Sequence, residues 1–226
     1  MKKLHLHPGL AAFGALLSLS AAAHAAILLG NYPQINNNLS FSIGGQFQLA
    51  VSFTTPNQPY DVDSITLRLS DYTSALDTPA VGIYTDNADA PSTTLIGALF
   101  TNPNSPSTGI NDFPFNANGS VPLSANTKYW MLVDASAGSF LWRASDSDNP
   151  NPRTPTGDAT FGRFALSFDN GASYNDPNTA PYNFLHTFQI NATAVPEPVH
   201  VSLAIGIALL AFAFYRRMMV AKRRET

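Results

Sequence analysis

Short runs of alternating apolar and polar residues fill the middle of this chain. In the run 47–53 large apolar residues occupy every second position, and in the run 65–70 every second residue is Ile or Leu. A period of two places successive side chains on opposite faces of an extended chain, as in a half-buried β-strand. Both runs are therefore predicted to be strands with one face in a core.

Further short apolar runs follow, with Gly, Pro, Asn and Asp between them, and the run 128–133 is almost continuously apolar. No helical periodicity extends over a dozen positions between residues 26 and 195. We expect an all-β domain over 26–193, an antiparallel β-sandwich (jelly-roll-like). The other expected strands are 27–31, 81–84, 95–100, 113–115, 128–133, 139–143, 164–168 and 182–190, and the stretch 121–127 leads into the strand 128–133.

Two connections between these runs are informative. The run 85–91 is rich in Asp, Asn and Ala and ends in Pro, so 81–84 and 95–100 are predicted to form a hairpin around it. The stretch 144–158 is polar and contains three prolines. Because long loops are uncommon unless they are functional or disordered, this stretch is the best candidate for a functional loop.

The N-terminus has the organisation of a secretory signal peptide. Lys2 and Lys3 precede the apolar stretch Gly9–Ala22, and small residues stand at Ala23 and Ala25. Signal peptidase reads small residues at these two positions. We expect residues 1–25 to be the signal peptide, with cleavage after Ala25, and the chain to be exported.

The C-terminal segment 194–226 has three parts. The motif Val195, Pro196, Glu197 and Pro198 precedes seventeen uncharged residues, 199–215, at the lower edge of the length of a transmembrane helix. A basic tail, 216–226, follows, and its cations orient it to the cytoplasm. We expect one membrane-spanning helix at 199–215 and a stop signal formed by Arg216, Arg217, Lys222, Arg223 and Arg224.

This order of motif, apolar helix and basic tail resembles the PEP-CTERM sorting signal of Gram-negative bacteria. The resemblance implies that an exosortase, an integral-membrane protease, recognises residues 195–198 and removes the helix. The precursor would then be anchored in the inner membrane and the product delivered to the cell surface or extracellular matrix. A single-span anchor that is never cut is the alternative.

Several stretches of the middle domain are similar to the bacterial choice-of-anchor R ectodomain. The resemblance spans most of 27–191 and implies a β-rich extracellular domain that is joined to different surface anchors, with no established catalytic residues. The stretches that carry it are 28–31, 52–55, 65–70, 81–87 with 90–91, 123–130 and 181–184.

The charge and the cysteine content of the chain exclude some classes of function. Residues 26–195 carry five Lys and Arg against thirteen Asp and no Glu, a formal charge of −8. Nucleic acid needs a basic surface, so no nucleic-acid partner is expected. The chain has no cysteine, which excludes cysteine nucleophiles and thiolate metal sites within it. Stability must come from core burial, for which about 170 residues suffice.

An enzymatic function finds little support in the sequence. His186 is the one histidine between residues 26 and 195, and by period it shares a face with Phe184 and Phe188. A structural core histidine is therefore favoured over a general base, and no nucleophile elbow or zinc-binding helix motif occurs. We expect a non-enzymatic protein. A matrix-polysaccharide hydrolase that uses two Asp carboxylates stays open as the alternative.

Two kinds of ligand, calcium and polysaccharide, are candidates for this domain. Calcium takes carboxylate and carbonyl oxygens, so Asp86 and Asp89, or Asp146 and Asp148, are calcium candidates, although neither pair matches an EF-hand loop. No other cofactor is expected. Trp142 and Arg143, or Tyr174, would suit a platform for matrix exopolysaccharide, but tryptophans within strand patterns are more often core residues.

These expectations combine into a structural or adhesive protein in an exopolysaccharide or biofilm context. Its expected processing partners are signal peptidase and an exosortase. A permanently anchored, single-span carbohydrate-binding protein is the second alternative.

Overall fold

The computed structural model describes residues 25–33, 39–73, 76–104, 107–146, 154–175 and 184–195, and the helical residues 206–207 and 209–217. Residues Ala25–Val195 form one compact unit, which corresponds to the expected ectodomain and is given that name below. Its strands are β1 (Ala25–Gly30), β2 (Leu39–Gly44), β3 (Gln48–Thr54), β4 (Tyr60–Ser70), β5 (Thr78–Asn87), β6 (Ala90–Ile96), β7 (Asn111–Asn116), β8 (Pro122–Leu123), β9 (Lys128–Ala137), β10 (Ser139–Asp146), β11 (Thr160–Ser167), β12 (Phe184–His186) and β13 (Phe188–Ala194).

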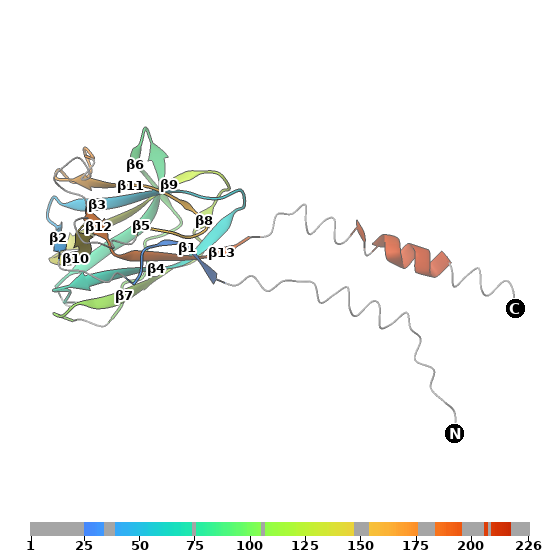
Figure 1. The fold of residues 1–226 in the computed structure, drawn as a ribbon, viewed down its shortest axis with the longest axis horizontal. Coiled ribbons are helices and arrows are strands. Elements are labelled where there is room, and N and C mark those ends of the chain that lie inside the picture. Colours follow the sequence, from blue (N-terminus) through green and yellow to red (C-terminus); the bar gives the residue numbers. More distant parts are fainter. Residues whose placement is uncertain are drawn as a thin grey trace, which may run out of the picture. The chain divides into compact units, whose positions relative to one another are not determined.

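The strands form two antiparallel sheets (Figure 1). An eight-stranded sheet has the order β1-β13-β4-β10-β12, with β2 beside β10 and with β7 and β8 beside β4. A five-stranded sheet has the order β11-β3-β9-β5-β6. Most neighbours within each sheet are distant in the sequence, so the sheets depend on long-range pairing.

One hydrophobic core joins the two sheets. Leu49, Val51 and Phe53 of β3 are fully buried, as are the alternate residues Ile65 and Leu67 of β4, and all five belong to one cluster. Full burial of such a side chain stabilises the fold by about 1.5–3 kcal/mol. The expected all-β antiparallel fold is therefore confirmed, and it has the two-layer arrangement of a sandwich.

The predicted hairpin is confirmed, but its turn is tighter than expected. Only Ala88 and Asp89 lie between β5 and β6, and both have positive φ, 49° and 67°. Two left-handed residues are typical of a type I′ turn, whose twist matches that of the flanking strands. The returning strand therefore begins at Ala90 and ends at Ile96, rather than covering 95–100.

The expected loop 144–158 is partly wrong. Residues 144–146 continue β10, because Ala144 and Ser145 are buried and pair with β12. Residues 147–153 lie outside the described part of the chain. Near its end the stretch returns to β1, where Thr156 and Gly30 exchange two backbone hydrogen bonds of 2.8 Å. Strand β2 was not expected from the sequence.

Beyond the ectodomain, residues 206–207 and 209–217 are helical. No helix among the described residues is long and apolar enough to cross a membrane. Residues 199–205 and 208 of the expected span 199–215 lie outside the described residues.

Candidate functional site

On the outward face of the five-stranded sheet, several residues are buried although they do not belong to the main core. Ala50 of β3, Trp130 and Leu132 of β9, and Ala165 of β11 form a second cluster, separate from the main core. Trp130, the largest of them, has no exposed surface. An outward-facing side chain is buried only when other groups cover it, and two sets of side chains do so here.

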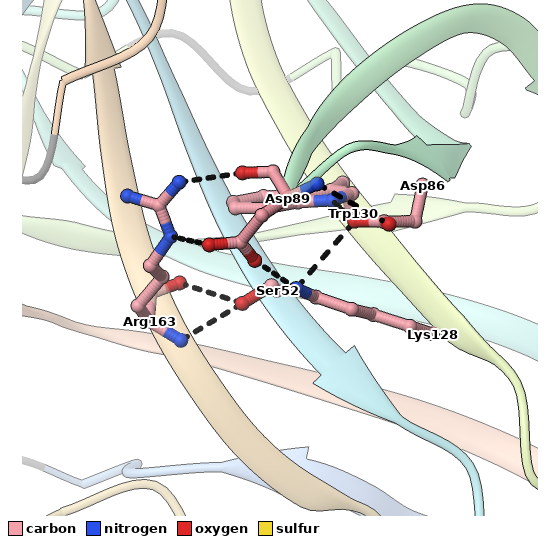
Figure 2. A network of polar contacts seen from close by, with 6 residues as sticks. All are labelled: Ser52, Asp86, Asp89, Lys128, Trp130 and Arg163. Carbon is pink, nitrogen blue, oxygen red and sulfur yellow. Dashed lines mark hydrogen bonds and ion pairs between the residues drawn. The ribbon is translucent and has the colours of Figure 1, made fainter.

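The first set is a charge cluster of Asp86, Asp89, Lys128 and Arg163 around Trp130 (Figure 2). The Trp130 indole Nε1 donates to Asp86 Oδ1 over 2.7 Å. Lys128 Nζ and Arg163 Cζ each lie 5.3 Å from the centroid of the indole ring, within the range of a cation–π interaction.

Asp89 joins the two cations of the charge cluster. Its carboxylate pairs with Lys128 and with Arg163, whose Nε lies 3.2 Å from Asp89 Oδ2. The hydrogen bond from Lys128, and the charges of Lys128 and Arg163, lower the pKa of Asp89. The two-residue turn presents Asp89 at the tip of the β5–β6 hairpin, so the charge cluster fastens this hairpin across the sheet.

This arrangement contradicts the calcium expectation for Asp86 and Asp89. A calcium ion needs several oxygen ligands free of competing cations, whereas Lys128 contacts both carboxylates and Arg163 contacts Asp89. The Asp146 side chain and Asp148 lie outside the described residues. Among the residues that the structure describes, no three His, Asp or Glu side chains come together as a metal site.

The second set, which we call the tyrosine patch, consists of Tyr84, Tyr174, Gln48 and Asp134. Tyr84 and Tyr174 are half-buried and pack against the second cluster. The Tyr174 hydroxyl donates to Gln48 Oε1 over 2.9 Å, and Gln48 Nε2 donates to Asp134 Oδ2 over 2.9 Å. The other Asp134 oxygen accepts a 2.7 Å bond from the amide of Ala135. These bonds fix the polar atoms relative to the two rings.

The environment of the tyrosine patch is shielded and acidic. Burial raises the pKa of Asp134, although hydrogen bonds from Ala135 and Gln48 act in the opposite direction. Burial, and then the negative charge of Asp134, raise the pKa of Tyr174 to about 12. Both phenols are therefore neutral near pH 7 and keep their hydroxyl protons.

The expected sugar platform at Trp142 and Arg143 is wrong. Trp142 is fully buried, and its indole Nε1 donates to the Thr187 carbonyl over 2.9 Å. Its ring lies 4.8 Å from that of His186, so neither ring can receive a sugar. Arg143 is partly buried on the same strand. In β10, Phe140 and Trp142 point into the core. The period-two pattern of the sequence shows which residues share a face of a strand but not which face is inward.

His186 is a core residue, as expected from its position between Phe184 and Phe188. It is 1% exposed, and burial lowers its pKa to about 3, against a smaller opposite effect of a hydrogen bond with the Trp142 backbone. Its Nδ1 has no hydrogen-bond partner among the described residues. A histidine enclosed in this way has no route to a substrate proton.

The residues expected to direct targeting lie at the limits of the described chain. Ala25 begins β1 and pairs with Thr193 of β13, and Val195 directly follows β13. Arg216 and Arg217 are helical. The remaining targeting residues lie outside the described part of the chain: Ala23, Pro196, Glu197, Pro198, Lys222, Arg223 and Arg224.

Sequence reasoning singled out Asp86, Asp89 and Tyr174 as ligand candidates but did not join them to the other covering side chains, although one signal was present. Lys128, Trp130, Leu132 and Asp134 are alternate residues, and charges begin and end the row. Alternate residues share one face of a strand. Charged residues at both ends of such a row indicate that this face points outward and has an apolar centre.

In comparisons with known proteins, no family model, no curated protein and no solved structure matches this chain.

Proposed function

We propose that this chain is an exported protein of the cell surface or extracellular matrix of a Gram-negative bacterium, structural or adhesive in an exopolysaccharide or biofilm context. The ectodomain is a non-enzymatic β-sandwich of jelly-roll type. Signal peptidase releases it after Ala25. An exosortase then recognises residues 195–198, next to a membrane helix at 199–215, and cuts there.

The observation that carries this proposal is the place where the ectodomain ends. Strand β13 ends at Ala194, and the Val195 amide donates to the Pro59 carbonyl over 2.9 Å. Pro196 is the next residue. Cleavage within 195–198 would therefore remove no residue of the sandwich, which is what a removable sorting signal requires.

The N-terminal junction supports the same proposal. Cleavage after Ala25 would leave β1 with residues 26–30, of which Leu28 and Leu29 are fully buried and belong to the main core. One backbone pair, Ala25 with Thr193, would be lost. Both processing sites thus flank the ectodomain without dividing it.

Intact mass of the protein recovered from the surface and medium of a Gram-negative host with an exosortase tests the proposal. We expect a form that begins at Ala26 and ends between Val195 and Pro198. Glu197→Gln should block the C-terminal cut, whereas the matched control Glu225→Gln changes the other glutamate of the chain and should not. A wild-type mass that still contains residues 199–226 would mean a permanently anchored protein.

A further inference from the structure

The tyrosine patch covers the second cluster, and it also has the features of a ligand site. The main core is complete without Tyr84, Tyr174, Gln48 and Asp134, which belong to the outward face. Four elements supply these groups: β3, β5, β9 and the turn after β11. Binding sites commonly combine aromatic surface with a few placed polar groups.

The rings of Tyr84 and Tyr174 offer apolar surface on the outward face of the sheet. Tyr84 and Tyr174 pack against a cluster that includes Ala50 and Ala165, whose small side chains add little bulk to the sheet surface. Both tyrosines are only half-buried, so part of each residue remains accessible. Tyrosine combines an apolar ring with a hydroxyl and loses little conformational entropy on binding, because it has two side-chain torsions.

The polar atoms are held in place before any ligand arrives. Gln48 links the Tyr174 hydroxyl to Asp134 through two bonds of 2.9 Å. A carboxylate has about four acceptor positions, and the hydrogen bonds from Gln48 and Ala135 use two of those of Asp134. The other acceptor positions of Asp134 can accept hydrogen bonds from the hydroxyl groups of a ligand. Fixed acceptors beside fixed rings reduce the ordering that binding requires.

The charge around the tyrosine patch determines which hydroxyl-rich ligands can bind there. Asp134 and Asp169 both raise the pKa of Tyr174 through their negative charge, so they lie near its hydroxyl. The cations Lys128 and Arg163 on this face are paired with Asp89. The region 26–195 is also acidic as a whole, with five Lys and Arg against thirteen Asp. A polymer that carries carboxylates would be repelled, whereas an uncharged one would not.

From this geometry we infer that the tyrosine patch binds an uncharged polysaccharide, whose sugar rings stack on Tyr84 and Tyr174 while their hydroxyls donate to Asp134. The inference rests on the proposed function in that it names the matrix partner of the exported ectodomain. Sugar rings have apolar C–H faces and hydroxyl edges, which match the two kinds of group in the patch.

Affinity electrophoresis of the protein recovered from the host tests this inference. Native gels contain hydroxyethyl cellulose, galactomannan, dextran or, as the anionic polymer, polygalacturonate. We expect at least one uncharged polymer to retard the protein and polygalacturonate to leave its mobility unchanged. Tyr84→Ala should weaken the retarding interaction about tenfold, since a stacked ring is lost. Tyr174→Phe keeps the ring and should weaken it roughly fivefold, because the hydroxyl is lost.

Tyr32 supplies matched controls. It is half-buried like Tyr84, and its hydroxyl donates over 2.7 Å to Asp112 of β7, in the other sheet. Tyr32→Ala and Tyr32→Phe should bind as the wild type does. No retardation by any uncharged polymer, equal retardation by polygalacturonate, or unchanged binding by Tyr84→Ala would each overturn the inference.

The outcomes separate this inference from the proposed function. A processed mass without polysaccharide binding would leave the sorting proposal standing and remove the ligand. Binding by a protein that retains residues 199–226 would keep the site and remove the sorting proposal.

Discussion

His186 is a titratable residue in a place that disfavours charge. The rings of Phe41, Trp142 and Phe164 lie 4.8–5.5 Å from its imidazole, and burial lowers its pKa to about 3 from an ordinary value of 6.5. The unfolded chain therefore takes up a proton below pH 6.5, while the folded chain does not. Stability is complete above pH 6.5 and declines as the pH falls from 6.5 towards 3.

This difference predicts a loss of about 1.4 kcal/mol per pH unit below pH 6.5, or about 2 kcal/mol between pH 8 and pH 5. His186→Leu removes the titrating group and should flatten that part of the profile. Denaturant unfolding at several pH values measures the effect. Asp112→Asn is the control, because it changes a carboxylate and should leave the decline between pH 6.5 and pH 5 in place. Parallel profiles for the wild type and His186→Leu would contradict the prediction.

The β5–β6 hairpin is an element whose position depends on charge as well as on its backbone pairing. Asp89 at its tip contacts Lys128 of β9 and Arg163 of β11, and thereby covers Trp130. Because Asp89 is 59% exposed, salt screens its ion pairs, and their contribution to global stability is below about 1 kcal/mol. Their local effect is confined to the hairpin, because Asp89 lies at its tip and both partners lie on other strands of the same sheet.

Asp89→Asn is the informative change in this hairpin. Asn tolerates the left-handed backbone of residue 89, so the variant keeps the turn and removes only the charge. We expect hydrogen exchange in residues 84–96 to accelerate several-fold, and the remaining protection to lose its dependence on salt. Asp71→Asn is a matched control, because Asp71 is also exposed and left-handed, with φ 53°. Equal exchange in both variants would show that the charge cluster does not hold the hairpin.

The elements differ in how far the sequence predicts them. The positions of β3 and β4 follow from local alternation, although β3 is buried on both faces from Gln48 to Phe53 rather than on the one face that the sequence predicts. The face of a tryptophan does not follow in this way. Trp142 lies in the main core and Trp130 on the outward face, yet both stand in apolar runs.

The candidate site was less predictable, because its contacts join distant parts of the chain. Arg163 meets Asp89 across 74 residues, and Tyr174 meets Gln48 across 126. Local patterns report which residues are apolar and where turns occur, but not which strands become neighbours. Of the tyrosine patch, Tyr174 alone was singled out from the sequence as a sugar-binding candidate, and its partners became known only from the strand order β11-β3-β9-β5.

At the scale of the molecule, the last strand connects the fold to the proposed sorting signal. Strand β13 lies between β1 and β4, so both of its edges carry backbone pairing. Its final residues are part of the sandwich, and Ala192 is fully buried. The ectodomain therefore needs the chain as far as Val195, whereas its pairing involves no residue beyond Val195 among those the structure describes.

Two truncations test this boundary. A chain that ends at Val195 should unfold with the same midpoint temperature as the processed protein, because every strand pair is kept. A chain that ends at Ile190 loses the pairs of residues 191–193 with β1 and those of residues 191–194 with β4. At about 0.5–1.5 kcal/mol per hydrogen bond, this loss is a large fraction of the stability of a domain, so we expect no cooperative transition at 37 °C or above. Thermal unfolding followed by circular dichroism measures both. If the chain ending at Val195 melted well below the processed protein, residues past 195 would contribute to the fold, and a cut within 195–198 would damage the domain that it releases.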